Sequence, residues 1–206
     1  EIGSGMGLHT YSLIKTGAHI IATDISPNSL QILEIKIKEV EGEVETIVAD
    51  MEKLPFQDGL FDVVTSAGSL SYGDAKIVDK EIRRVLKPDG LFICVDSLNN
   101  NPIYRLNRYI HFLKGNRSKM TLKNMPSIKR VNALKRLYSN VEVNYFGSIA
   151  FLMPIMKSIV GGKTAKRISD SFDKLIHVNK SAFKFVYFSI NSWGVPTNIH
   201  FLSHTL

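Results

Sequence analysis

A glycine-rich stretch at the start of this sequence has the residue types and spacing to bind a ligand. It reads Glu1-Ile2-Gly3-Ser4-Gly5-Met6-Gly7 and leads into a helical pattern from Leu8. Glycine has no Cβ, so the backbone can turn tightly there and approach a ligand closely. The helix that follows would offer free N–H groups and the positive end of its dipole. The pattern predicts a loop for a nucleotide-class ligand at a strand-to-helix junction.

The spacing of these glycines argues against a dinucleotide. The GxGxxG fingerprint requires a small residue at its third glycine position. A fingerprint that begins at Gly3 would place Leu8 there, and one that begins at Gly5 would place Thr10. The stretch is therefore interpreted as E-x-G-x-G-x-G.

Acidic residues recur at the ends of strand-length apolar runs, namely Glu1, Asp24, Asp50 and Asp96. Strand and helix patterns alternate along this half of the chain, which predicts a largely parallel sheet with helices on both faces. Because such sheets bind ligands at the carboxyl ends of their strands, the four acids would line one rim.

The chemistry of such a rim suits a nucleoside. A carboxylate can accept both hydroxyls of a ribose, and Asp24 lies about 20 residues past the glycine stretch, as in nucleotide-binding folds. Asp50 could accept the adenine amino group, the Met51 backbone could serve a ring nitrogen, and Ile25 could pack on the adenine face. Taken singly, each acid could also be a solvated loop residue or a helix N-cap.

The expected elements of this half follow from periodicity and from turn residues. Ser26-Pro27 is typical of a helix start, and Gly17 of a helix end. The predicted helices are 8–16, one beginning at 26–27, and 77–86 closed by a turn at 87–90; the predicted strands are 19–23, 43–49, 61–66 and 91–95.

Five motifs in this order resemble those of the class I S-adenosylmethionine-dependent methyltransferases. They are E-I-G-S-G-M-G, T-D-I, A-D-M, F-D-V-V-T-S-A and L-K-P-D-G-L-F, and they span residues 1–96. The resemblance implies a doubly wound, Rossmann-like α/β sheet, mostly parallel with an antiparallel last strand, and an enzyme that uses S-adenosylmethionine. It implies that Glu1 and the Gly3–Gly7 loop, including Ser4 and Gly5, hold the methionine part of the cofactor. Asp24 would take the ribose, Asp50 and Met51 the adenine, and Ser66 and Ala67 would border the sulfonium.

The second half is expected to complete that sheet and to add a cap. Residues 141–146 and 181–190 read as a terminal antiparallel pair, with helical patterns at 149–160 and 163–176 between them. About forty residues, 98–140, form an insertion that we interpret as two or more amphipathic helices over the cleft. The methyltransferase domain would then be residues 1–190, and residues 191–206 a C-terminal tail.

The insertion is strongly basic. Between residues 97 and 141 there is no Asp or Glu, whereas ten Lys or Arg occur there. Such a block creates a positive surface field and suggests an anionic acceptor, although a merely solvated basic face is the alternative. Arg side chains suit phosphate or carboxylate. One apolar stripe of the first helix would be formed by Ile103, Leu106, Ile110 and Leu113.

The catalytic group is left open among Tyr72, Asp96 and His111. Transfer of a methyl group from a sulfonium depends mainly on positioning, and a general base helps if the acceptor is a hydroxyl. The resembling family usually carries an N/D-P-P-Y motif when it methylates amide or exocyclic amino nitrogens, and no such motif follows the strand at 61–66. No His/Cys cluster predicts a metal, and Cys94 lies inside an apolar strand.

Three functions remain open at this point. The first is a methyltransferase acting on a small, anionic, sugar- or lipid-linked acceptor. The second is an RNA methyltransferase using the basic block, and the third is a non-catalytic cofactor-binding interaction module. No run is long and apolar enough for a transmembrane helix, peripheral membrane contact is kept open, and the cytoplasm is the expected location. The abrupt opening at Glu1 predicts a fragment that lacks the first strand of its sheet.

Overall fold

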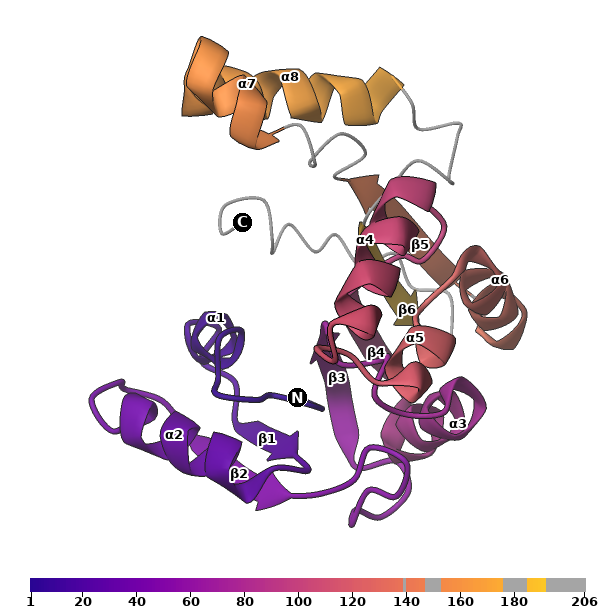
Figure 1. The fold of residues 1–206 in the computed structure, drawn as a ribbon. Helices are drawn as coiled ribbons and strands as arrows, with labels where there is room; N and C mark the ends of the chain where they lie inside the picture. The colour runs from indigo at the N-terminus through magenta and orange to yellow at the C-terminus, as the bar shows by residue number, and fades with distance from the viewer. Residues whose placement is uncertain (139, 147–152, 176–184, 192–206) are drawn as a thin grey trace.

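The computed structural model describes residues 1–138, 140–146, 153–175 and 185–191. Strands and helices alternate through the first half, and the later described helices all come between β4 and β6 in chain order (Figure 1). The expected α/β class is therefore confirmed.

The first half contains most of the elements that the sequence predicts. They are α1 (Thr10–Ile14), β1 (Ile20–Asp24), α2 (Pro27–Ile37), β2 (Val44–Val48), β3 (Phe61–Ala67), α3 (Ala75–Val85) and β4 (Leu86–Ser97). The start of α2 is as expected, because Ser26 is its N-cap and its hydroxyl accepts the Ser29 N–H. Helix α1 is shorter than the predicted 8–16, since residues 5–9 are mostly turn and the helix begins only at Thr10.

The turn predicted at residues 87–90 lies within the bounds of β4. Phe61 pairs with Leu86 and Val63 pairs with Leu91, so four residues of β4 stand opposite Asp62 alone. The ladder is irregular at this point, and the Lys-Pro-Asp-Gly sequence accounts for it because proline donates no ladder hydrogen bond.

The strands follow one another in the order β2, β1, Ile2, β3, β4, β6, β5. Pairing is parallel between β1 and β2 and between β3 and β4. Ile2 forms parallel bridges to both Thr23 of β1 and Ser66 of β3. The opening residues therefore occupy the position between β1 and β3, in the middle of the sheet.

The second half contains α4 (Pro102–Leu113), α5 (Lys119–Asn124), α6 (Ile128–Leu137), β5 (Asn140–Phe146), α7 (Met153–Val160), α8 (Gly162–Leu175) and β6 (Phe185–Asn191). The predicted antiparallel end of the sheet is confirmed, since β6 runs antiparallel to both β4 and β5. Residues 149–152, 176, 181–184 and 192–206 of the predicted segments lie outside the described residues.

One large hydrophobic core joins the sheet to α3 and α6. It includes Ile2, Phe92 of β4, Val78 and Ile82 of α3, and Leu134 of α6. A smaller core packs Leu30 and Leu33 of α2 against Ala22 of β1. Because α6 belongs to the main core, only α4 and α5 are left as the outer part of the insertion (Figure 1).

Candidate cofactor and acceptor site

The glycine bend, residues 3–7, has a left-handed backbone at each of its glycines. The φ angles of Gly3, Gly5 and Gly7 are 63°, 55° and 82°. A Cβ on Gly3 would lie 2.4 Å from the Ser69 Cβ, and one on Gly7 would lie 2.2 Å from the Leu33 Cδ1. A Cβ on Gly5 would meet nothing within 4 Å. Packing thus accounts for the outer two glycines, whereas the middle one adjoins open space.

Asp24 lies directly against this bend. Its Oδ2 accepts the Gly5 N–H at 2.8 Å and its Oδ1 accepts the Ser26 N–H at 2.9 Å. A carboxylate offers about four acceptor positions, so two bonds leave room for the two hydroxyls of a ribose. The expected partnership of Asp24 with the bend is present in the structure.

Glu1 is attached to the same place by its backbone and its side chain. Its nitrogen donates to the Ile21 carbonyl and its carbonyl accepts the Thr23 N–H, which continues the parallel ladder with β1. The Thr10 hydroxyl donates to the Glu1 carboxylate at 2.5 Å. Burial raises the pKa of Glu1, and the nearby charge of Asp24 adds to this increase. The two acids are therefore close enough to interact.

Asp50 follows β2 at the same end of the sheet. The Ala49 N–H donates to the Asp24 carbonyl at 3.0 Å, which fixes Asp50 one residue from the end of β1. Asp50 is exposed, and its Oδ1 accepts the Glu52 N–H. Met51 packs against the main core, and Ile25 leaves 69% of its surface exposed. The rim thus has one exposed acid and one exposed apolar side chain beside Asp24.

The loop after β3 is bonded to the bend through buried serines. The Ser69 hydroxyl donates to the Ile2 carbonyl at 3.0 Å, and the Ser66 and Ser69 hydroxyl oxygens lie 2.8 Å apart. Ser66 is buried and Ala67 is half-buried, so Ala67 is the more accessible of the two predicted sulfonium neighbours. The Gly68 N–H donates to the Val95 carbonyl, which continues the ladder between β3 and β4 by one bond.

Asp96 lies under this loop and is almost fully buried. Its Oδ2 accepts the Leu70 N–H at 3.1 Å and its Oδ1 accepts the Ser97 N–H at 2.6 Å. Burial raises the pKa of Asp96, while these two bonds and the charges of Arg130 and Arg108 oppose the increase. At 2% exposure, this carboxylate supports the loop and does not face solvent.

Two arginines of the basic block are buried beside these acids. Arg130 binds both carboxylate oxygens of Asp79, with N–O distances of 2.5 and 3.3 Å, and donates to the Leu70 carbonyl. Arg108 donates to the Leu98 carbonyl at 3.1 Å. The basic block was expected to form one positive surface field. For Arg108 and Arg130 this expectation is wrong, because nearby acids and backbone carbonyls give them buried partners.

The apolar stripe predicted on α4 faces solvent and not the core. Tyr104 and Arg108 are the buried residues of this helix, whereas Ile103, Leu106, Ile110 and Leu113 are exposed. Asn101 caps the helix by accepting the Ile103 N–H, so its start is well defined.

A pocket of about 380 Å³ lies between the loop after β3 and the cap. It is lined by Tyr72, Asn116, Arg117, Ser118 and Thr121. Of the three catalytic candidates, Tyr72 is the one that lines it. The other wall includes the Asn-Arg-Ser run at 116–118, which no motif or periodicity in the sequence indicates.

The other catalytic candidate on the cap lies next to this pocket. The Asn116 side-chain nitrogen is 3.5 Å from the His111 Nδ1, and the Asn116 N–H donates to the His111 carbonyl. His111 is exposed. It is thus a neighbour of the pocket wall.

Comparison with known proteins supports the arrangement of the first half. A protein-family model described as "Methyltransferase domain" matches residues 1–94, which include the bend, Asp24, Asp50 and Ser66. Residues 1–94 are therefore similar in sequence to a methyltransferase domain, in agreement with the resemblance noted in the motifs.

Two curated relatives match the same region. The sterol 4-C-methyltransferase strm-1 of Caenorhabditis elegans is 36% identical over 104 residues, which are 49% of this chain and 31% of that protein. The demethylmenaquinone methyltransferase of Lactococcus lactis is 35% identical over 111 residues, 51% of this chain and 44% of that protein. The chain spans less than half the length of both relatives.

A solved structure extends the likeness of the fold over most of the chain. The geranyl diphosphate C-methyltransferase of Streptomyces coelicolor superposes with a TM-score of 0.63 over 93% of this chain and 72% of that one, at 16% identity. The methyltransferase fold therefore includes the later helices and strands as well as the matched domain.

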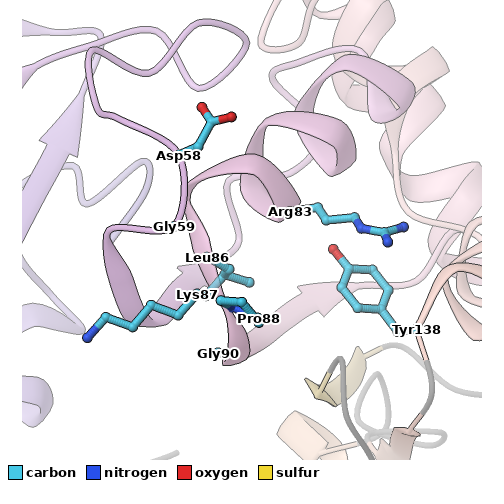
Figure 2. Close-up of a pocket in the computed structure, with 8 residues that line it drawn as sticks. All are labelled: Asp58, Gly59, Arg83, Leu86, Lys87, Pro88, Gly90 and Tyr138. Atoms are coloured by element: carbon cyan, nitrogen blue, oxygen red, sulfur yellow. The ribbon is translucent and has the colours of Figure 1, made fainter.

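A second pocket, of about 410 Å³, lies at the opposite end of the sheet (Figure 2). It is formed where β3 and β4 begin, by Asp58, Gly59, Arg83, Leu86, Lys87, Pro88, Gly90 and Tyr138. The Arg83 guanidinium and the Tyr138 hydroxyl lie near each other on one wall (Figure 2). The acids and the glycine bend are at the carboxyl ends of the strands, so this pocket lies away from the predicted cofactor residues.

Within the described ranges, no group of three or more His, Cys, Asp or Glu side chains is arranged to hold a metal ion. None of the helices described is both long and apolar enough to cross a membrane.

Proposed function

We propose that this chain binds S-adenosylmethionine at the glycine bend and transfers its methyl group to a small acceptor held in the pocket beside Tyr72. The observation that carries the proposal is the contact between Asp24 and Gly5, because it holds the carboxylate that we propose for the ribose next to the bend. A cofactor with a ribose and an amino-acid end would need both a carboxylate for the ribose and a glycine bend for the amino-acid end.

The surroundings of the bend support a ligand there. Gly5 adjoins open space, and Ile25 next to Asp24 is largely exposed although it is apolar. The Ser4 hydroxyl is buried and has no hydrogen-bond partner among the described residues. Buried polar groups are normally satisfied, so a bound molecule would supply this partner. In this proposal Ile25 packs on the adenine, and Asp50 with the Met51 backbone takes its polar edge.

The acceptor side of the proposal depends on Arg117. This side chain lines the pocket. Burial lowers the pKa of Arg108, and the charge of Arg117 adds to that decrease. The two cations, Arg108 and Arg117, repel each other, and an anion bound to Arg117 in the pocket would offset this repulsion. The proposed acceptor is therefore small and carries an anionic group, as in a lipid- or sugar-linked phosphate. The relatives named for a sterol and for demethylmenaquinone favour the lipid-linked class.

The reaction is a displacement at carbon. A nucleophilic atom of the acceptor forms a bond to the methyl carbon while the bond from carbon to sulfur breaks, and the bonding pair stays on sulfur. The products are S-adenosylhomocysteine and the methylated acceptor, which loses one proton. If the acceptor atom is a hydroxyl oxygen, the Tyr72 hydroxyl in the pocket is the proposed group through which this proton leaves.

Calorimetry with S-adenosylmethionine tests the cofactor half. We expect binding, and we expect Asp24→Ala to weaken it by at least about tenfold, or about 1.4 kcal/mol. Asp89→Ala is the control, because Asp89 is exposed in the irregular part of β4, outside the site. Absence of binding by the unaltered chain would overturn the proposal.

Transfer of a labelled methyl group from S-adenosylmethionine to fractionated cell extract tests the acceptor half. Label is expected in the lipid fraction, and Asp24→Ala should abolish it while Asp89→Ala should not. Label confined to RNA would replace the proposed acceptor with a nucleic acid. Cofactor binding without any transfer would leave a non-catalytic binding module.

A further inference from the structure

One side of α4 presents a continuous row of apolar side chains to solvent. The row consists of Ile103, Leu106, Tyr109, Ile110 and Leu113, which are 41–67% exposed. Their spacing of three or four residues places them on one side of the helix. We call this surface the α4 face. Tyr104 and Arg108, on the other side, are buried.

This orientation is the reverse of the usual one. A surface helix normally turns its apolar side to the core and its charges to water. Helix α4 instead has a buried arginine, which donates to the Leu98 carbonyl and the Asn99 side chain, and an exposed apolar row. Contiguous exposed apolar patches mark interaction sites in folded proteins.

Cations flank the α4 face and continue beyond it. Arg105 and Lys114 of the same helix segment are exposed, and so are Arg117, Lys119 and Lys123 on the chain that follows. Between residues 97 and 141 no acidic residue offsets them. An apolar row bordered by Lys and Arg is the composition of helices that lie in the surface of a membrane with anionic lipids.

We propose that the α4 face docks onto an anionic lipid membrane, with its apolar row in the upper acyl region and its cations among the headgroups. The charges favour this occupant over a second copy of the chain, because two such faces would bring like charges together. The helix has twelve residues and a length of about 18 Å, so it would lie along the surface and not cross it.

The docked orientation would bring the acceptor pocket to the lipid. Asn116, Arg117 and Ser118 of the pocket wall come directly after α4 and its C-cap, Lys114. The docking inference does not depend on methyl transfer, since lipid binding is measured without cofactor or acceptor.

Sedimentation with lipid vesicles tests the proposal. The chain is expected to bind vesicles that contain phosphatidylglycerol together with phosphatidylcholine, and to bind phosphatidylcholine alone much more weakly. Leu106→Glu combined with Leu113→Glu should reduce the bound fraction by at least about tenfold, since apolar burial and charge attraction are both weakened. The matched control is Ile35→Glu with Ile159→Glu, because these apolar side chains, on α2 and α7, are 66% and 75% exposed and lie outside the α4 face.

Two further measurements keep the result unambiguous. Circular dichroism shows whether each double variant is folded, and Arg105→Gln with Lys114→Gln tests the face without new acids; this variant should lose the preference for phosphatidylglycerol. Unchanged vesicle binding by Leu106→Glu/Leu113→Glu would overturn the proposal. So would a dimer in analytical ultracentrifugation that this variant abolishes, in a chain that does not bind vesicles.

Discussion

The carboxylate of Asp24 accepts the backbone N–H of Gly5 at 2.8 Å. This bond joins the end of β1 to the middle of the glycine bend, about twenty residues earlier in the chain. A ligand that binds the carboxylate therefore also meets the bend, and the position of each depends on the other. The cofactor proposal depends on this pair more than on any single residue.

The three glycines of the bend should respond differently to alanine. Gly7→Ala would place a Cβ 2.2 Å from the Leu33 Cδ1, so it should lower the free energy of unfolding by more than the roughly 1–2 kcal/mol of left-handed strain alone. Gly5→Ala carries only that strain, and its Cβ would occupy the open space where the cofactor is proposed. We expect it to weaken cofactor binding more than folding.

Urea unfolding and calorimetry of both alanine variants check this contrast. Gly17→Ala is the control, since Gly17 also has a positive φ and open surroundings but lies outside the bend. Equal losses of affinity in Gly5→Ala and Gly17→Ala would show that the open space beside Gly5 is not the ligand position.

Breaking the buried pair of Asp79 and Arg130 should be costly. Arg130→Met leaves Asp79 buried without its cation, and such a loss typically costs about 3–5 kcal/mol of unfolding free energy. Arg136→Met on the same helix removes an exposed charge and should change stability by less than about 0.5 kcal/mol. Thermal or urea unfolding measures both. A small effect in Arg130→Met would mean that Asp79 is protonated or solvated in the fold.

The raised pKa of Asp96 predicts a pH dependence of stability. A carboxyl group whose pKa is higher in the fold than in the unfolded chain binds its proton more tightly when folded. Its contribution to the free energy of unfolding therefore falls as pH rises from the ordinary aspartate pKa of 3.8 through the raised pKa of the folded state. Asp96→Asn should lose this component, although it also lowers stability at every pH because one backbone donor loses its acceptor.

Asp62 offers a control of opposite sign. Its hydrogen bond with Lys87 lowers the pKa of Asp62. Any stability that it adds is therefore present above the ordinary aspartate pKa and is lost as pH falls through the lowered pKa of the folded state. Urea unfolding between pH 3 and pH 8, a range set by ordinary carboxyl values, compares Asp96→Asn with Asp62→Asn. If both variants change the pH profile in the same direction, the predicted contribution of Asp96 to the pH dependence of stability is wrong.

Arg117 and Tyr72 of the acceptor pocket should affect different kinetic constants. Arg117→Ala should raise KM for an anionic acceptor by about tenfold while cofactor affinity is unchanged, since a charge-assisted hydrogen bond contributes about 1.5–3 kcal/mol. Tyr72→Phe should lower kcat with a smaller effect on KM if the acceptor is a hydroxyl. Lys129→Ala removes an exposed cation of α6 that does not line the pocket, and it should change neither constant.

The first half of the fold was accessible from the sequence because its signals are local. Ser26-Pro27 specifies a helix start, and Asp24 and the glycines have a spacing that places them on one rim. The end of the sheet was predicted as well, because β5 has an alternating pattern and β6 is rich in aromatic and β-branched residues. These signals need no knowledge of distant contacts.

The interior of the insertion was not accessible in the same way. Nothing in the local pattern distinguishes Arg108 and Arg130 from their exposed neighbours, because each is buried by a partner far along the chain or in another element. Asp79 lies 51 residues from Arg130. The stripe on α4 has core-like spacing, yet the tertiary structure turns it outward. The pocket wall at residues 116–118 is a loop without periodicity.

The backbone of Leu70 joins two parts of the structure. Its N–H is bound by Asp96 of the sheet and its carbonyl by Arg130 of α6, so a single peptide segment connects the first half of the fold to the insertion. An exchange of the whole insertion, residues 98–140, for one from a different protein would leave Asp79 without its counter-ion and the Leu70 carbonyl without its donor. A chimeric chain designed to alter the proposed acceptor should therefore replace residues 102–124 and retain α6.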